Sequence, residues 1–147
     1  MPRLSPIEAA GLAAANRGVR GGRRPPSRPE REVVREILKY LGTRPDVTAW
    51  RQNSGMLRGS YKGKERVIRF GGMAGMADII GWQRERVAYT GLGVRWTIAR
   101  FIAIECKGSP SAKLSPHQEA FLNHVRASGG IAILASSVAD VVEALGT

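Results

Sequence analysis

Residues 101–109 read FIAIECKGS and decide the fold class. The run opens with apolar side chains on both alternating faces, which is typical of a central strand covered on each side in an α/β protein. Glu105 and Lys107 follow at the exit of this strand, before Gly108. Because alternate side chains of a strand share a face, the two charged groups are expected about 6–7 Å apart on one side, with Cys106 turned to the other. Solvent at a sheet edge would account for these charges, whereas a buried strand demands a partner or a function for them.

Helical and strand patterns surround this strand in the order helix, three or four strands, helix, strand, helix. Apolar residues at helical spacing predict a first helix over residues 29–42, and Ser115 and Pro116 begin a second that the glycines at 129–130 end. The predicted strands cover residues 47–53, 66–70, 77–82, 101–107 and 131–136, and a last helix covers 138–145. Residues 83–96 fit either a hairpin extension or an exposed loop. This order predicts an α/β domain with a mixed sheet.

Composition favours one globular domain with a polyanionic partner. The chain has 147 residues, 43% of them hydrophobic, and carries a net charge of +11. Such an excess of Lys and Arg favours nucleic acid, because each neutralised phosphate releases counterions, although ribosomal proteins and binders of anionic membranes share it. A lone cysteine suits a reducing compartment, and no uncharged apolar run reaches the roughly 20 residues that a membrane span needs. We therefore expect a soluble, cytoplasmic protein with no membrane partner.

Two basic segments are candidates for contact with phosphates. Residues 1–28 hold six arginines and one acid in a Gly/Pro-rich context, which predicts a flexible basic arm, with a short helix around 6–16, ahead of a domain over 29–147. This arm would track phosphates or would be a plain solvated tail. Residues 51–69 are also basic and predict a DNA-contacting flap or an exposed hairpin made soluble by charge. The candidate contacts here are Arg51, Arg58, Tyr61, Lys62, Lys64, Arg66 and Arg69.

A second carboxylate, Asp78, opens another apolar run after a glycine-rich turn. Taken alone it fits a turn or capping residue. If its strand is the neighbour of residues 101–107, Asp78 and Glu105 converge at one sheet edge. A hard divalent cation commonly relieves the repulsion between two close carboxylates.

Two helical residues complete the candidate site. The apolar stripe of the first helix is centred near the direction of Glu30, while Glu32 lies opposite and Glu36 well off the stripe. Glu30 would therefore face the interior. The alternative is that Glu30 only stabilises the helix as an acid in its first turn, at the positive end of the helix dipole. Gln118 lies three residues after Ser115, which is a capping-box pattern, and also on the apolar side of its helix. Both interpretations of Gln118 can hold together.

This ordered set of polar residues resembles a known nuclease family. Glu30, the G-M-A-D run ending in Asp78, the I-E-C-K run with Glu105 and Lys107, and the S-P-H-Q run ending in Gln118 are similar to the VRR-NUC branch of the PD-(D/E)xK superfamily, in particular to small stand-alone members common in phages. The likeness spans roughly residues 29–140 and implies the restriction-endonuclease-like fold, an α-β-β-β-α-β core. Ala77 replaces the proline of the superfamily motif, and residues 83–100 are longer than the minimal hairpin of the family.

The resemblance implies a role for each of these residues. Asp78 and Glu105 would bind Mg²⁺ or Mn²⁺ with the backbone carbonyl of Cys106, and Glu30 would hold a metal-bound water or a second ion. Lys107 would orient or deprotonate the attacking water and stabilise developing charge, and Gln118 would position water or backbone. Residue chemistry agrees, because phosphodiester hydrolysis needs a Lewis acid, an activated water and cationic support. Two carboxylates beside Lys107 also favour its protonated form, which makes it more an electrostatic aid than a base.

The sequence therefore predicts a metal-dependent deoxyribonuclease that cuts flapped, branched or Holliday-junction-like DNA. No large specificity domain is present, and a homodimer follows by analogy because two strands need two active sites. His117, beside Gln118, would touch phosphate or lie on the surface, and its spacing from His124 and Cys106 does not predict zinc. The alternative is a non-catalytic nucleic-acid-binding protein that kept the fold, but a pure binder has no need to hold three acids beside an anionic ligand.

Overall fold

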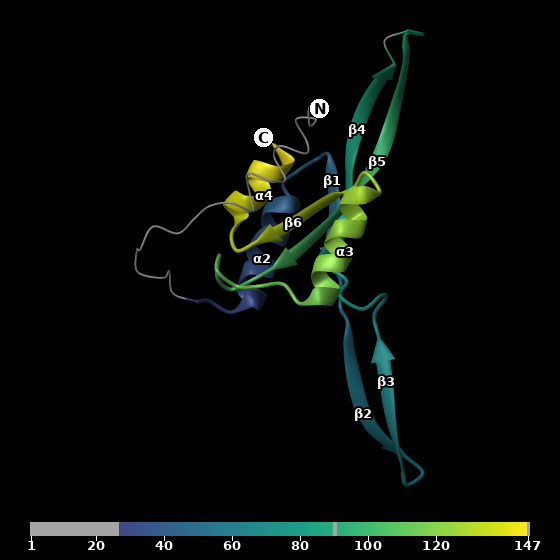
Figure 1. Cartoon of the computed structure of the whole chain (residues 1–147), viewed down its shortest axis with the longest axis vertical. Coiled ribbons are helices and arrows are strands. Elements are labelled where there is room, and N and C mark those ends of the chain that lie inside the picture. The colour runs from purple at the N-terminus through teal and green to yellow at the C-terminus, as the bar shows by residue number, and fades with distance from the viewer. Residues whose placement is uncertain (1–26, 90, 147) are drawn as a thin grey trace, which may run out of the picture.

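The computed structural model describes residues 27–89 and 91–146. A four-stranded sheet lies at the centre with the order β1-β4-β5-β6, and β2 and β3 form a separate two-stranded sheet (Figure 1). The described elements are α2 (Glu30–Leu41), β1 (Val47–Arg51), β2 (Gly55–Tyr61), β3 (Lys64–Phe70), β4 (Ile79–Tyr89), β5 (Val94–Cys106), α3 (Pro116–Ala127), β6 (Ile131–Ala135) and α4 (Val138–Leu145). The predicted basic arm, apart from Ser27 and Arg28, and its short helix lie outside the described residues.

The central sheet is mixed, as predicted. Strands β1, β4 and β5 pair antiparallel, and β6 pairs parallel to β5. The register turns Ile79, Ile102 and Ile104 to one face, where they form the main core with α2 and α4. We call this the α2/α4 face. Ala103 points to the opposite face, the α3 face, and packs there against Phe121 and Leu122 of α3.

The core elements follow the order α2-β1-β4-β5-α3-β6, with the β2–β3 hairpin inserted after β1. This mixed sheet flanked by three helices has the restriction-endonuclease-like architecture that the sequence predicts. Residues 102–106 of β5 are buried, which confirms the central strand. Within the described residues, no helix is long and apolar enough to cross a membrane.

Two hairpins extend from the body in opposite directions (Figure 1). Residues 83–96 are part of a hairpin extension, because β4 continues to Tyr89 and pairs with β5 from Val94 onward. We call the part of this hairpin beyond Gln83 and Arg100 the β4–β5 arm. Residues 51–69 give two strands where the pattern indicated only a short one at 66–70. Their tight turn places Lys62 and Gly63 at positive φ, as two-residue hairpin turns require.

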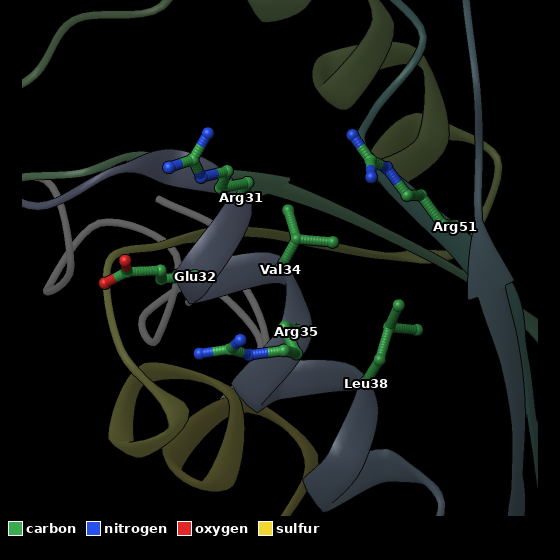
Figure 2. A pocket seen from close by; sticks show the side chains of 6 residues that line it. All are labelled: Arg31, Glu32, Val34, Arg35, Leu38 and Arg51. Carbon is green, nitrogen blue, oxygen red and sulfur yellow. The ribbon is translucent and has the colours of Figure 1, made fainter.

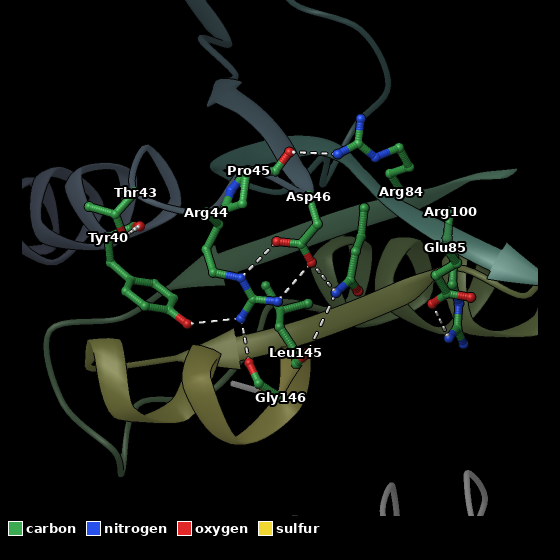
Figure 3. Close-up of polar contacts among 11 residues, drawn as sticks. Tyr40, Thr43, Arg44, Pro45, Asp46, Arg84, Glu85, Arg100, Leu145 and Gly146 are labelled. Carbon is green, nitrogen blue, oxygen red and sulfur yellow. Dashed lines mark hydrogen bonds and ion pairs between the residues drawn. The ribbon is translucent and has the colours of Figure 1, made fainter. Parts of the chain in front are cut away.

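A polar network closes the end of the sheet away from the charged exit of β5 (Figure 3). Arg44 donates to both carboxylate oxygens of Asp46, at 2.9 and 2.8 Å, and also to the carbonyl of Gly146. Gln83 donates to Asp46 at 2.9 Å, and these hydrogen bonds hold the pKa of Asp46 well below its usual range. Arg100 and Glu85 form an ion pair of 3.0 Å at the base of the β4–β5 arm. The network joins the start of β1 and the middle of β4 to the end of α4.

Candidate active site

Glu105, Lys107 and Gln118 form one hydrogen-bonded cluster on the α3 face. Lys107 Nζ donates to Glu105 Oε1 at 2.8 Å and to Gln118 Oε1 at 3.3 Å. Gln118 Nε2 donates to the same Glu105 oxygen at 2.5 Å. Glu105 and Lys107 are the buried charged residues of the described chain, with 2% and 9% of their surface exposed. A buried acid and ammonium persist because they neutralise and hydrogen-bond each other.

The start of α3 holds Gln118 in this cluster. Gln118 Oε1 accepts the backbone N–H of Ser115 at 2.9 Å, and the Ser115 hydroxyl accepts the backbone N–H of Gln118. This is the predicted capping box, and the same side chain contacts Glu105 and Lys107, so both interpretations of Gln118 hold. The cap therefore fixes an amide whose oxygen and nitrogen both point at the buried ion pair.

Asp78 joins the cluster through the backbone of β5. Its Oδ2 accepts the backbone N–H of Cys106 at 2.9 Å, whereas the N–H of Lys107 donates to Ala135 of β6 on the other side of the strand. Since the N–H and C=O of one strand residue point the same way, the carbonyl of Cys106 also faces the Asp78 side. Asp78, Glu105 and this carbonyl are thus gathered at one end of β4 and β5.

Glu30 reaches the cluster from the first turn of α2. Its Oε1 is 3.9 Å from Lys107 Nζ, although about half of its side chain is exposed rather than turned into the core. The chain before α2 fixes this position, because the N–H of Arg28 donates to the carbonyl of Gly108 at 3.0 Å. A Cβ at Gly108 would overlap the Arg28 carbonyl. The glycine after Lys107 therefore lets the start of α2 approach the site.

A second glycine joins Asp78 to the helix that carries Gln118. Gly75 has φ of +75°, and a Cβ there would overlap the backbone of His117. The loop before β4 therefore lies directly on the first turn of α3. Only glycine permits this contact without strain, because it tolerates both the conformation and the close approach.

The surroundings of the cluster raise the pKa of both Lys107 and Glu105. Burial raises the pKa of Glu105, and the charges of Asp78 and Glu30 add to this, while the hydrogen bond from Lys107 opposes it. Burial disfavours the ammonium of Lys107, but its hydrogen bond to Glu105 and the surrounding carboxylates prevail and raise its pKa. Lys107 is therefore a cation at neutral pH, held by the acids around it.

Comparison with known families agrees with this geometry. The family model described as the VRR-NUC domain matches residues 60–139, which is more than half of the chain. The chain belongs to the VRR-NUC family. Searches of the curated proteins and of the solved structures found no match. The matched range contains Asp78, Glu105, Lys107 and Gln118, and membership makes the chain a nuclease, a hydrolase that acts on DNA.

VRR-NUC and related nuclease domains generally use divalent metal ions, and the donor chemistry of this cluster fits such an ion. The hydrogen bonds given above use Oδ2 of Asp78 and Oε1 of Glu105. Among the described residues, the second oxygen of each carboxylate, Oδ1 of Asp78 and Oε2 of Glu105, accepts no protein hydrogen bond and can therefore serve as a metal ligand. No three His, Cys, Asp or Glu side chains of residues 27–89 and 91–146 gather as a metal cage. Two carboxylates and a backbone carbonyl form an oxygen donor set that suits Mg²⁺ or Mn²⁺.

The predicted phosphate contacts occupy three separate places in this VRR-NUC chain. His117 is exposed at the first turn of α3, beside Gln118. Arg51 lines an open hollow of about 520 Å³ with Arg31 and Arg35 of α2 (Figure 2), two arginines that the sequence did not single out. Their place on the helix surface next to β1 depends on packing that no local pattern reveals.

The β2–β3 hairpin carries the remaining predicted contacts. Every residue of both strands is exposed, and register places Arg58 and Arg69 on one face and Lys64 and Arg66 on the other. At the tip, the Tyr61 ring lies 5.5 Å from Lys62 Nζ and 5.4 Å from the Arg66 guanidinium. The hairpin is basic on both sides and does not form a one-sided strip.

Proposed function

We propose that this protein is a Mg²⁺- or Mn²⁺-dependent endonuclease that cuts flapped, branched or junction DNA. The convergence of Asp78, Glu105, Lys107 and Gln118 at one end of the sheet carries the proposal. An ion held by Asp78, Glu105 and the Cys106 carbonyl would supply Lewis-acid polarisation of the phosphate and activation of a water. Glu30 would hold a water of that ion or a second ion.

Each side chain of the cluster contributes through its own atoms. Lys107 presents a fixed positive charge where negative charge develops on the phosphate, and this charge costs no reorganisation during the reaction. Gln118 holds the Lys107 ammonium and the Glu105 carboxylate in one arrangement. One oxygen of Glu105 is thus held by the protein, and the other would be available to hold the ion.

The surface of the protein supports a preference for DNA structure over DNA sequence. The β2–β3 hairpin and the Arg31–Arg35–Arg51 hollow offer cationic side chains suited to phosphates, which position DNA without reading its sequence. The hairpin would clasp the duplex beside a flap or junction, with Tyr61 stacking on an unpaired base.

A substrate panel tests the proposal. Linear duplex, flapped and four-way-junction DNA are incubated with the protein in Mg²⁺, Mn²⁺ or EDTA. We expect metal-dependent cleavage of the branched substrates by the wild type and none by Glu105→Ala, with Glu143→Ala on the exposed side of α4 as the control. Absence of cleavage with metal, or equal cleavage by Glu105→Ala, would leave a nucleic-acid-binding protein that kept the fold.

We also propose that the active species is a homodimer, because cutting both strands of a junction in one encounter requires two sites. Light scattering on the full chain at micromolar concentration is expected to give twice the mass of one chain. A monomer that still cuts both strands of a junction would contradict this proposal.

A further inference from the structure

The α3 face of the central sheet is only partly covered. Helix α3 packs on β5 and β6, while residues of β1 and β4 on the same face remain open (Figure 1). Three aromatic side chains lie in this open part. Trp50, Trp82 and Phe101 are 43%, 40% and 42% exposed. We call these three side chains the aromatic platform.

Strand register brings the platform together. Trp82 is the direct cross-strand partner of Phe101, and Trp50 pairs with Ile80, two residues before Trp82. Side chains of such partners share one face of the sheet. The rings of Trp50 and Trp82 lie 5.5 Å apart at 72°. The platform is thus one contiguous surface built from β1, β4 and β5.

The platform borders the candidate active site. It lies on the sheet face to which Glu105 points, and β4 leads from Asp78 to Trp82 in four residues, a rise of about 13 Å. Gln52, directly after β1, donates its N–H to the backbone carbonyl of Asp78 at 2.7 Å, so Trp50 lies two residues along β1 from the backbone of Asp78. A bound polymer that extended from the site along β4 would pass over Trp50 and then over Trp82.

Basic side chains continue the same surface on the β4–β5 arm. Register places Arg84, Arg86 and Arg95 on the α3 face of the arm, and all three are exposed. Within the described residues none of them forms an ion pair, although the guanidinium of Arg84 donates to the carbonyl of Pro45 at 3.2 Å (Figure 3). The opposite face of the arm carries instead the apolar side chains Val87, Tyr89, Val94, Trp96 and Ile98.

We propose that the platform and these three arginines bind an unpaired strand of the DNA substrate. Exposed aromatic rings stack on bases of any sequence, and arginines next to them neutralise the phosphates. Bases can stack on protein rings only when they are unpaired, so the site selects a flap or frayed end over intact duplex. Three side chains of the same positive charge in one row complement a phosphate backbone, whereas a protein partner would need acidic groups opposite all three. This inference depends on the proposed nuclease function only for the statement that the bound strand continues into the active site.

Binding without cleavage tests the site. Fluorescence anisotropy in EDTA measures the affinity for a labelled oligothymidylate of about 15 nucleotides, near the upper site size of single-strand binding domains. Trp82→Ala is expected to bind it roughly 5- to 150-fold more weakly, the loss expected for one stacked base. Trp82→Phe, which keeps a ring, should restore much of the affinity. The matched control is Trp96→Ala, the same change at comparable exposure on the opposite face of the hairpin, with less than about a twofold effect.

A spectroscopic readout reports the platform alone. The chain has three tryptophans, so Trp96→Phe leaves only Trp50 and Trp82, both on the platform. Oligothymidylate is expected to quench the fluorescence of this variant, and a blunt duplex at the same phosphate concentration is expected to quench it far less. Arg86→Gln should weaken the binding and flatten its salt dependence, because one phosphate contact is lost.

Three outcomes would overturn the inference. Trp82→Ala and Trp96→Ala could bind the oligonucleotide equally, the quenching could be the same with blunt duplex, or Trp82→Ala could change the molar mass and thereby mark the platform as a protein interface. None of these readouts requires cleavage. A protein that binds single strands through the platform but cuts no DNA would refute the proposed function and leave this site intact.

Discussion

Lys107 Nζ lies 2.8 Å from Glu105 Oε1, and both residues are almost completely buried at the end of β5. These two residues, which share one face of β5, thereby form an ion pair with little access to water. Gln118 contacts both partners, so a helix cap and a charge pair share one amide. This arrangement holds the Lys107 ammonium in a constant position, as an active site that uses a fixed cation requires.

Replacing the cation should slow cleavage. Lys107→Gln keeps a group that can donate to Glu105 but removes the positive charge. We expect the cleavage rate to fall about 10²–10³-fold, the size typical for losing one group that stabilises transition-state charge. Loss of one partner of a buried ion pair also destabilises the fold, so the rates are compared at a temperature below the unfolding midpoints of both proteins. Lys39→Gln, on the exposed side of α2, serves as the control, and a Lys107→Gln variant that cuts at the wild-type rate would remove Lys107 from the mechanism.

Gly75 should be needed for both stability and activity. Gly75→Ala places a Cβ against the His117 backbone at a residue with φ of +75°. We expect a loss of about 1–2 kcal/mol in the free energy of unfolding from the backbone conformation alone, and a larger loss of cleavage because Asp78 and Gln118 move apart. Urea unfolding and cleavage rates measure the two effects. Gly59→Ala is the matched control, because a Cβ there meets nothing within 4 Å, and equal behaviour of both variants would refute the contact.

Asp46 should make stability depend on acid pH. Its folded-state pKa lies below the ordinary value of 3.8, because Arg44 and Gln83 donate to its ionised form. The resulting stabilisation is complete above about pH 5 and is lost as the pH falls through the folded-state pKa. We expect Asp46→Asn to cost about 1 kcal/mol at pH 7, given the partial exposure of the pair, and we expect this difference from the wild type to shrink as the pH falls below about 4. Urea unfolding at several pH values measures this, and a constant difference across them would contradict the assignment.

Cys106 should be inert in the folded protein. It is fully buried, and burial together with the nearby Asp78 and Glu105 carboxylates raises the pKa of its thiol. As the single cysteine of the chain, it allows a direct measurement with a thiol-specific reagent. At pH 8 we expect labelling only at the rate of unfolding, because the thiolate is the reactive form. Labelling of the native protein as fast as that of the urea-unfolded chain would contradict the packing of β5.

Part of this site was predictable because it depends on short-range geometry. Alternation along β5 puts Glu105 and Lys107 on one face, and the spacing from Ser115 to Gln118 marks a cap, whatever the rest of the chain does. The buried pattern of β5 likewise identifies a central strand. Glu30 was predicted to face the interior, whereas about half of its side chain is exposed and its carboxylate lies 3.9 Å from Lys107 Nζ.

The rest depends on long-range pairing that local patterns do not specify. Trp50 and Trp82 meet only because β1 pairs with β4 in a particular register, and Arg28 meets Gly108 across the sheet end. The β2–β3 hairpin has no buried residue, so it gave no apolar periodicity from which to recognise its first strand. The alternation of Arg84 and Arg86 was present in the sequence and could have indicated a strand with one basic face.

The two glutamates of α2 provide the sharpest test of how this helix serves the site. Glu30 Oε1 is 3.9 Å from Lys107 Nζ, whereas Glu36 is bound to Arg28 at 2.6 Å on another side of the helix. Glu30→Gln should therefore lower the cleavage rate by about tenfold or more, as loss of a metal-supporting residue does, and should shift the metal concentration for half-maximal activity upward. Glu36→Gln should retain the wild-type metal dependence, because its partner is Arg28 and not the cluster. Activity that survives Glu30→Gln but is lost in Glu36→Gln would mean that α2 presents a different face to the metal than the one turned toward Lys107.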